Sequence, residues 1–284
     1  MPELPEVEIT ARRLDAALAG ATIESVTAPG INALKTFDPP LSALEGREIT
    51  RVGRRGKHLL VESGDLLLLV HLMSAGRLQL YDKRAGPRDR TSRLLVRIAD
   101  PDHPRELRLR EFGTKQAAWV KLLRADALED EEVIASLGPE AWPDPPADLR
   151  ALLRAARPLH TLLRDQRVIA GIGRSWVDEI LWTARLSPFK RGNDLDAEEA
   201  AALREAIVAT LGGALEHYEQ VVHLPIPDKL PLPLQVHRKA GEPCPRCSAT
   251  IEAVHYEDYV MCYCPEEQTA GKVLKDRRLS RLLK

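Results

Sequence analysis

The first twenty residues carry an apolar pattern with a helical period. The positions that share one face, at i, i+4, i+7 and i+11 spacing, are Val7, Ala11, Leu14 and Leu18. That spacing is typical of an amphipathic helix, and a glycine directly after it is a common helix stop. The sequence therefore predicts an N-terminal helix that ends close to Gly20.

Short apolar runs separated by turn residues dominate the next hundred positions. They predict strands within ATIESVTA, REITRVG, KHLLVE, DLLLLVHLM, SRLLVRIAD, ELRLREF and KQAAWVKLL. Ser63-Gly64-Asp65 supplies a tight connection between two of these runs. Many short strands with turn signals between them are typical of a β-sandwich or a β-barrel.

The pattern becomes helical after an acidic, proline-containing stretch that starts near Leu128. Helical spacing is found in LRALLRAA, LHTLLRDQ and SWVDEILWTARL, and a longer helix is predicted from Asp196, where Glu199 completes a capping-box pattern. The four prolines of HLPIPDKLPLPLQ exclude a helix interior there and predict a linker. We expect three domains, at residues 1–128, 129–235 and 236–284.

Composition and charge place the chain among ordinary globular proteins. It has 284 residues, 44% of them hydrophobic and 29% charged. No apolar run approaches the ~18 residues of a membrane span, and no secretory signal is evident, so we expect a cytoplasmic protein. The net charge of −1 does not by itself indicate a polyanion ligand, but basic residues gather at 77–97 and 271–284. Such segregation suits phosphate binding, with two solvated faces as the alternative.

All four cysteines lie in one short C-terminal window, which contains Cys244, Cys247, Cys262 and Cys264. Clustering of this kind in a cytoplasmic chain favours a metal over disulfides. The Cys-x-x-Cys pair followed by a third cysteine is typical of a structural zinc ribbon, so Zn²⁺ is the expected cofactor. Cys262 is the first choice for the fourth ligand, with Glu267 and His255 as alternatives. A metal-free hairpin is the other interpretation.

The chain begins MPELPEVE, and its first residues raise a chemical possibility. A free α-amino group has a pKa near 7.7–8.0, against about 10.4 for lysine, so a tenth of it is neutral near pH 7. If Met1 is removed, Pro2 becomes a secondary amine that can attack an aldehyde-like carbon, with Glu3 beside it for proton transfer. The alternative is a proline-started helix whose acidic residues complement its N-terminal dipole.

Six motifs occur in a characteristic order: PELPEVE, GRRGKHLLVE, REFG, LGPEAW, DQRVIAGIGRSWVDEILWTARLSP and GEPCPRC with YCPEEQ. Together they resemble the formamidopyrimidine-DNA glycosylase/endonuclease VIII (Fpg/Nei) family along the whole chain. The resemblance implies an α+β multidomain fold. It would contain an N-terminal β-sandwich with a flanking helix, a helix–two-turn–helix domain that binds DNA, and a C-terminal zinc-ribbon hairpin with a basic tail.

The resemblance also implies an activity on damaged double-stranded DNA. Pro2 would attack C1′ of a damaged nucleotide, Glu3 would protonate the sugar or the leaving base, and the resulting Schiff base would allow strand cleavage. Lys57 would bind a phosphate near the lesion. The enzyme would be a bifunctional DNA glycosylase and abasic-site lyase of base-excision repair, and we expect a monomer. The lesion that it removes is not indicated by the sequence.

Several positions are expected to contact the DNA, and some depart from the family pattern. Phe112 would wedge into the base stack, Arg110 would bond the orphaned partner base, and Met73 would fill the void, although it is shifted by one position. Arg174 stands where the family has Asn, and Tyr259 where it has a phosphate-binding Arg. The family's lysine before the two-turn segment is replaced, and its fourth zinc cysteine is missing. The two residues at those positions are His160 and Glu267.

Arg90 is a further candidate phosphate contact, which its charge alone suggests. Because the departures concentrate at DNA-contacting positions, a second function class remains: a DNA-binding relative with weak or altered activity. A zinc-ribbon adaptor for protein partners would leave the intact PELPE start unexplained.

Overall fold

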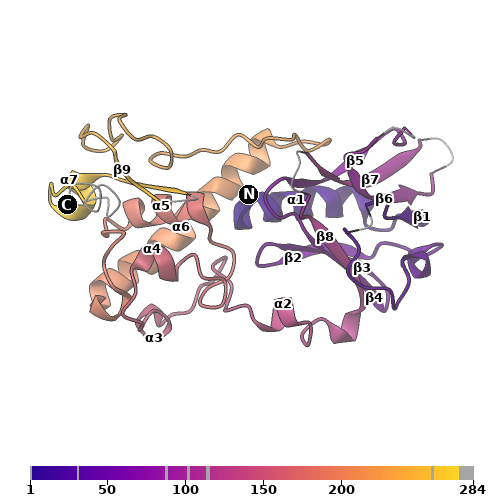
Figure 1. The fold of residues 1–284 in the computed structure, drawn as a ribbon, viewed down its shortest axis with the longest axis horizontal. Helices are drawn as coiled ribbons and strands as arrows, with labels where there is room; N and C mark the ends of the chain where they lie inside the picture. The colour runs from indigo at the N-terminus through magenta and orange to yellow at the C-terminus, as the bar shows by residue number, and fades with distance from the viewer. Residues whose placement is uncertain are drawn as a thin grey trace. The chain divides into compact units, whose positions relative to one another are not determined.

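The computed structural model describes residues 2–30, 32–86, 89–100, 103–112, 116–256 and 259–274 (Figure 1). Most of the expected basic tail, at 275–284, lies outside these residues. The chain forms two compact units, an N-terminal unit of residues 1–136 and 215–231 and a C-terminal unit of residues 137–214 and 232–284. The division into three domains stays a prediction. Among the described residues, no helix combines the length and apolar character that crossing a bilayer requires.

Two four-stranded antiparallel sheets form the body of the N-terminal unit. The first, in spatial order, contains β2 (Arg51–Arg55), β3 (His58–Ser63), β4 (Leu66–His71) and β8 (Trp119–Arg124). The second contains β1 (Ile23–Thr27), β6 (Ser92–Ile98), β7 (Arg105–Glu111) and β5 (Gly76–Tyr81). The strands predicted from the sequence are confirmed. The short strand β5 was not among the predicted strands, although Arg77 and Gln79 alternate with Leu78 and Leu80 as in a half-buried strand.

Helix α1 (Leu4–Leu18) packs along β2 and confirms the predicted N-terminal helix. Near its end, the backbone N–H of Val52 donates to Asp15 Oδ1 at 2.7 Å. About two turns closer to the start of the helix, Arg54 Nε donates to Glu8 Oε2, also at 2.7 Å. The helix and the strand therefore run in opposite directions. The first residues of the chain must lie at the end of the sheet where β2 turns into β3.

Short helical segments complete the N-terminal unit, together with the end of a long helix. The segments are η1 (Leu41–Leu44), η2 (Ala125–Ala127), α2 (Glu132–Ala135) and the last turns of α6 (Ala197–Val221). The chain after α6 follows the second sheet. Arg77 Nε donates to the backbone oxygen of Asp228 at 2.6 Å, which ties this segment to β5.

The C-terminal unit combines short helices with a two-stranded hairpin. Its elements are α3 (Leu149–Leu152), α4 (Leu159–Leu162), α5 (Arg174–Thr183), η3 (Gly192–Asp194), most of α6, β9 (Glu252–His255), β10 (Val260–Tyr263) and α7 (Pro265–Thr269). The capping box predicted at the start of α6 is present, because Asp196 and Glu199 exchange backbone-to-carboxylate hydrogen bonds of 3.1 and 2.8 Å. Sandwich, helical region and hairpin confirm the predicted fold class.

Candidate active site and metal centre

The turn between β2 and β3 carries Lys57. Gly56 has a φ of 55° at the first position of this two-residue turn, which suits the left-handed conformation that glycine adopts without strain. Lys57 takes the second position, and its residue is only 7% exposed. Lysine at a hairpin tip is normally solvated, so a buried one is unusual. The position is not that of an ordinary surface lysine.

The first turn of α1 is held by a capping box between Glu3 and Glu6. The backbone N–H of Glu3 donates to Glu6 Oε2 at 2.7 Å, and the Tyr218 hydroxyl donates to Glu6 Oε1 at 2.7 Å. Burial, with the Glu6 and Glu3 carboxylates nearby, raises the pKa of Tyr218, which therefore stays a donor. Pro2 is half-buried and Glu3 is buried, while Met1 lies outside the described residues. The helix with an acidic first turn, which was the alternative interpretation of these residues, is thus present. The capping box fixes the geometry of the chain start.

Arg110 and Phe112 come together at the end of β7. The Arg110 guanidinium carbon is 4.6 Å from the centre of the Phe112 ring. Arg110 Nη1 donates to the Tyr81 hydroxyl at 2.6 Å, and Arg110 Nε donates to Thr91 Oγ1 at 3.1 Å. Phe112 is 38% exposed, which is unusual for a large apolar side chain. An oriented cation therefore lies beside an exposed ring.

Glu111, which sequence reasoning missed, closes the loop that follows Phe112 at its base. Its buried carboxylate accepts hydrogen bonds from the backbone N–H groups of Ala117 and Ala118 at 2.8 and 3.0 Å. Arg93 Nε lies 3.9 Å from Glu111 Oε2, and Arg93 Nη1 donates to Gln116 Oε1 at 2.7 Å. The sequence did contain a signal for this role, because Glu111 takes the next position on the strand face of the apolar residues Leu107 and Leu109.

Met73 lies in the segment that connects the two sheets. Its φ of 49° is left-handed, and by alignment of HLMSAG with the family pattern it occupies the glycine position. Its backbone N–H donates to His71 Nδ1 at 3.1 Å. The His71 ring stacks on Trp119 with centres 5.6 Å apart. Burial, with His58 and Lys57 nearby, lowers the pKa of His71 to about 3, so its ring is neutral and accepts this bond.

These residues converge at one end of the N-terminal unit. His58 pairs with His71 across β3 and β4, which puts the Lys57 turn and the Met73 segment at the same edge. Gly76, the first residue of β5, pairs with Glu111, so β7 also ends there. The chain start joins them through the direction of α1. Arg90 is exposed and lies just before β6. Five candidates and the α1 start thus share one end of the sandwich.

The other two DNA-contact candidates meet in the C-terminal unit. Arg174 is the first residue of α5, and its guanidinium carbon is 5.2 Å from the centre of the Tyr259 ring. Arg164, which no motif indicated, is nearer, at 4.1 Å. The His160 ring stacks on the same ring at 5.7 Å. Tyr259 is therefore the centre of a basic and aromatic cluster.

Two acidic residues of α5 face inward and organise this unit. Asp178 Oδ2 accepts from the backbone N–H of Cys262 at 3.0 Å and lies 2.7 Å from His237 Nδ1. The Glu179 carboxylate accepts hydrogen bonds from the backbone N–H groups of residues 235, 236 and 237, at 2.9, 2.9 and 2.8 Å. Burial raises the pKa of Glu179 despite these donors. Adjacent acidic residues on a helix are usually solvated, so the burial of Asp178 and Glu179 was not evident from the sequence.

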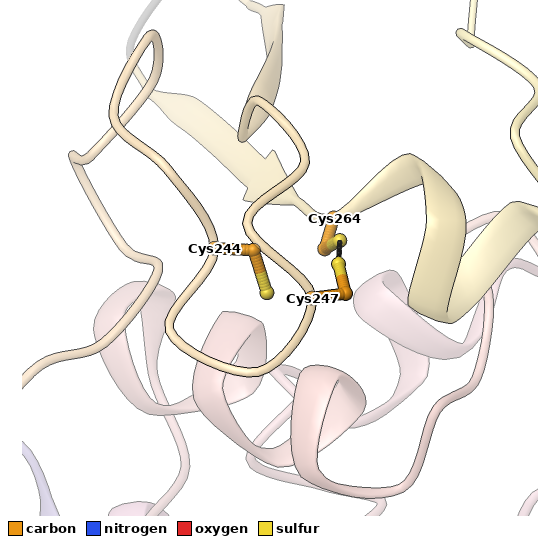
Figure 2. A group of neighbouring side chains, drawn as sticks. All are labelled: Cys244, Cys247 and Cys264. Atoms are coloured by element: carbon orange, nitrogen blue, oxygen red, sulfur yellow. Dashed lines mark hydrogen bonds between the residues drawn. The ribbon is translucent and has the colours of Figure 1, made fainter.

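Three of the four cysteines form a cluster (Figure 2). The sulfur atoms of Cys244, Cys247 and Cys264 all lie within 4.8 Å of one another, and those of Cys247 and Cys264 are 3.4 Å apart. Tetrahedral zinc–thiolate bonds of ~2.3 Å imply sulfur–sulfur distances of about 3.8 Å, so the spacing suits one metal ion.

The remaining fourth-ligand candidates are not part of this cluster. Cys262 packs among the same buried apolar residues as Cys244 and Cys264, and burial raises the pKa of its thiol. His255 is exposed. The Glu267 carboxylate lies 3.1 Å from Arg185 Nε and 3.2 Å from Arg246 Nη2. At the position of the missing cysteine the structure thus has a carboxylate paired with two arginines.

The electrostatics of Cys244 also suit a metal ligand. Burial would raise its pKa, but N–H groups of Arg246 and Cys247 and the indole of Trp182 lower it to about 7. Backbone N–H groups aimed at a cysteine sulfur stabilise the thiolate, which is the form that binds metals. The three cysteines therefore fit three positions of a metal site.

Comparison with known proteins agrees with this geometry. Residues 1–115 match the model of the formamidopyrimidine-DNA glycosylase N-terminal domain, and residues 137–224 match that of its H2TH domain. The chain is 31% identical to a formamidopyrimidine-DNA glycosylase of Streptococcus agalactiae over 267 residues, which cover 89% of this chain and 93% of the relative. It is 33% identical to the formamidopyrimidine-DNA glycosylase of Herpetosiphon aurantiacus over 288 residues, which cover 93% of this chain and 98% of the relative.

Solved structures give the same result. A complex of the Lactococcus lactis protein with abasic-site DNA superposes with a TM-score of 0.82 at 28% identity, covering 94% of this chain and 99% of that one. A complex of the same protein with DNA that contains an N7-benzyl-formamidopyrimidine lesion superposes with a TM-score of 0.83 and covers 94% and 100%. Two domain models, full-length relatives and solved structures agree along the chain. The chain belongs to the formamidopyrimidine-DNA glycosylase family.

Proposed function

We propose that this chain removes damaged bases from double-stranded DNA and then cleaves the strand at the resulting abasic site. The observation that carries the proposal is the convergence of the α1 start with Lys57, Met73, Arg110 and Phe112 at one end of the sandwich. Full-length relatives named as glycosylases, and neighbours solved with abasic-site DNA, support the same activity.

The first chemical step is displacement of the base by the chain start. The lone pair of the Pro2 nitrogen forms a bond to C1′ of the extruded nucleotide, and the bond from C1′ to the base breaks. The Pro2 nitrogen, which became positively charged on forming this bond, loses its proton, and the leaving base takes one up. The C1′–O4′ bond then opens, O4′ takes a proton from Glu3, and Pro2 is left as an iminium. Because proline is a secondary amine, this iminium carries a permanent positive charge.

The iminium makes strand cleavage possible. Its charge acidifies the C2′ proton, and loss of that proton allows the C3′–O bond to break, with the bonding electrons leaving on the 3′ phosphate oxygen. Water then hydrolyses the iminium and restores the Pro2 amine. The reaction needs no redox partner, since every bond change is a proton transfer, a substitution or an elimination.

The other residues at this end would bind and hold the distorted DNA. Lys57 would pair with a phosphate beside the lesion, and the exposed Phe112 ring would enter the gap that base extrusion leaves. Arg110, oriented by Tyr81 and Thr91, would bond the orphaned partner base. Met73 would fill the remaining void. Arg174 and Arg90 would contact the backbone, and Tyr259 would lie beside it with Arg174 over its ring.

Cys244, Cys247 and Cys264 would hold a structural Zn²⁺. Its chemistry there is to cross-link the loop before β9 to the end of β10, so that the hairpin keeps one shape. Cys262, Glu267 and His255 are the candidates for the fourth position. The geometry favours a site of three cysteines, because Glu267 pairs with Arg185 and Arg246.

A panel of duplexes tests the function, each with one oxidised purine, one oxidised pyrimidine or one abasic site. We expect base release and strand cleavage on at least one damaged duplex and on the abasic-site duplex, with an undamaged duplex left intact. Binding to damaged duplexes without cleavage of any of them would instead identify a DNA-binding relative without the activity.

A further inference from the structure

Arg164 is a basic residue to which the sequence patterns assign no role, yet its guanidinium lies on an aromatic ring. Its Cζ atom is 4.1 Å from the centre of the Tyr259 ring, the shortest approach in the basic cluster around that ring. Arg164 follows α4 by two residues, and Tyr259 directly precedes β10. The contact therefore joins the helical part of the C-terminal unit to the tip of its hairpin.

The Tyr259 ring is held in place by several neighbours. The Tyr256 ring stacks on it at 4.3 Å and 9°, and the backbone N–H of Tyr256 donates to the Tyr259 carbonyl at 2.9 Å. The His160 ring stacks at 5.7 Å and 15°. His160 Nε2 lies 3.2 Å from Asp178, which also accepts the backbone N–H of Cys262 in β10. The ring is thus a fixed platform.

A guanidinium that stacks on a ring uses its face for that contact. Its N–H donors lie in the guanidinium plane and stay suited to a phosphate, which they bind in a bidentate manner. The ring orders the long arginine side chain in advance, so less conformational entropy is lost when an anion binds. The second guanidinium, of Arg174, lies 5.2 Å from the same ring centre. This second cation adds positive charge beside the same ring, which favours an anion nearby.

We propose that Arg164, held on the Tyr259 ring, binds a backbone phosphate of the damaged DNA and supplies the cation that the hairpin lacks at position 259. The inference rests on the proposed function, because its ligand is the DNA substrate. In this arrangement Tyr259 contributes its ring and not its hydroxyl.

The test is equilibrium binding to a duplex with a stable abasic-site analogue, measured by fluorescence anisotropy over a range of salt concentrations. The variants are Arg164→Ala, Arg164→Lys, Tyr259→Phe and Tyr259→Ala in the full chain. Arg167→Ala is the matched control, because Arg167 is an exposed arginine three residues further along the same loop. Circular dichroism and thermal unfolding verify that each variant is folded.

We expect Arg164→Ala to weaken binding about tenfold and to reduce the slope of log K against log salt by about 1. Arg164→Lys recovers the slope, since lysine keeps the charge, and Tyr259→Phe binds like the wild type. Tyr259→Ala weakens binding because the guanidinium loses its platform. The inference is overturned if Arg164→Ala binds as tightly as Arg167→Ala, or if Tyr259→Phe is as defective as Tyr259→Ala. The first three variants decide the matter even if Tyr259→Ala does not fold.

The failure of this inference is distinguishable from failure of the proposed function. If the wild type does not prefer the abasic-site duplex, the proposed function fails and this inference with it. If the wild type binds and cleaves normally while Arg164→Ala changes neither affinity nor salt slope, only the role of Arg164 is wrong.

Discussion

The two units of this molecule differ in how closely they keep the family pattern. At the end of the N-terminal unit where the candidate residues converge, the PELPE start, Lys57, Arg110 and Phe112 stand where the family motifs have them, and Met73 is shifted by one position. This end is called the active end below. In the C-terminal unit, the positions of Arg174, Tyr259 and Glu267 have changed.

The changed positions are nevertheless engaged in other interactions. Tyr259 carries Arg164 and Arg174 on its ring, and Glu267 pairs with Arg185 and Arg246. The comparison indicates that bond-making chemistry needs particular atoms, such as a secondary amine, at one place. Phosphate binding needs only a cation near the right place, and several side chains can supply it.

The largest expected effect is at the active end. Glu3→Gln should slow base release and strand cleavage about 10²–10⁴-fold, the usual contribution of a general acid. Glutamine keeps an oxygen for the helix cap, so stability and damaged-DNA affinity should change little. Single-turnover kinetics measure the rate, with Glu216→Gln, an exposed position of α6, as the control. A loss below tenfold would remove Glu3 from the chemistry.

The proposed zinc comes next, because it would hold the hairpin that carries Tyr259. We expect one zinc ion per chain by elemental analysis, and chelation should weaken damaged-DNA binding about a hundredfold, since metal binding and folding of such sites are coupled. Cys247→Ser should lose the metal, whereas Cys262→Ser should retain it. If Cys262→Ser also lost the ion, Cys262 would be the fourth ligand and the three-cysteine geometry would be incomplete.

The wedge ring should have an intermediate effect. Phe112→Ala should lower kcat/KM on a lesion duplex about tenfold, because stacking of one base on an aromatic ring is worth ~1–3 kcal/mol. Affinity for a single-stranded abasic oligonucleotide should stay the same, since no stack has to be filled there. Phe37→Ala, which removes another exposed ring of the same unit, is the control. Equal losses in both variants would argue against an intercalating role.

The last expected effect concerns stability in mild acid and not the activity on DNA. Burial, with Arg55 and Lys57 nearby, lowers the pKa of His58 to about 4 from its usual 6.5. Between these values the unfolded chain binds a proton that the folded chain does not, so stability is full above pH 6.5 and falls as the pH drops. At pH 5 the loss is about 2 kcal/mol for this ring.

Urea unfolding at pH 7 and pH 5 measures this loss. His58→Gln should make the stability less dependent on pH, whereas His223→Gln, at an exposed position, should leave the dependence unchanged. An identical pH dependence in wild type and His58→Gln would show that the buried ring pair near Lys57 does not set the acid sensitivity.

Much of the fold could be predicted because its signals are local. The period of Val7, Ala11 and Leu14 indicated α1, and Asp196 with Glu199 indicated the start of α6. The burial of the polar residue Gln79 in β5 shows the limit of local signals. Gln79 is buried because it donates to the chain near Asp228, about 150 residues away, and no local pattern reports such a partner.

The site could be predicted only in part, for a similar reason. Motifs identified the positions of Pro2, Lys57 and Arg110, whereas Arg164 carries no motif and becomes notable only through its ring partner. The cysteine spacing indicated Cys264 as the third ligand and Cys262 as the first choice for the fourth, but only Cys264 lies with Cys244 and Cys247. Only tertiary structure distinguishes two cysteines that are two residues apart beside the same strand.

The most direct test of the account is to trap the Schiff base. Abasic-site duplex, enzyme and sodium borohydride are mixed, and the cross-linked chain is digested and mapped by mass spectrometry. We predict a covalent adduct on the nitrogen of Pro2 in a chain that has lost Met1. In the Pro2→Gly variant, the N-terminus should not form an adduct at a rate comparable to that of the wild type. A chain that retains Met1, or an adduct that maps to a lysine in the wild type, would contradict the account.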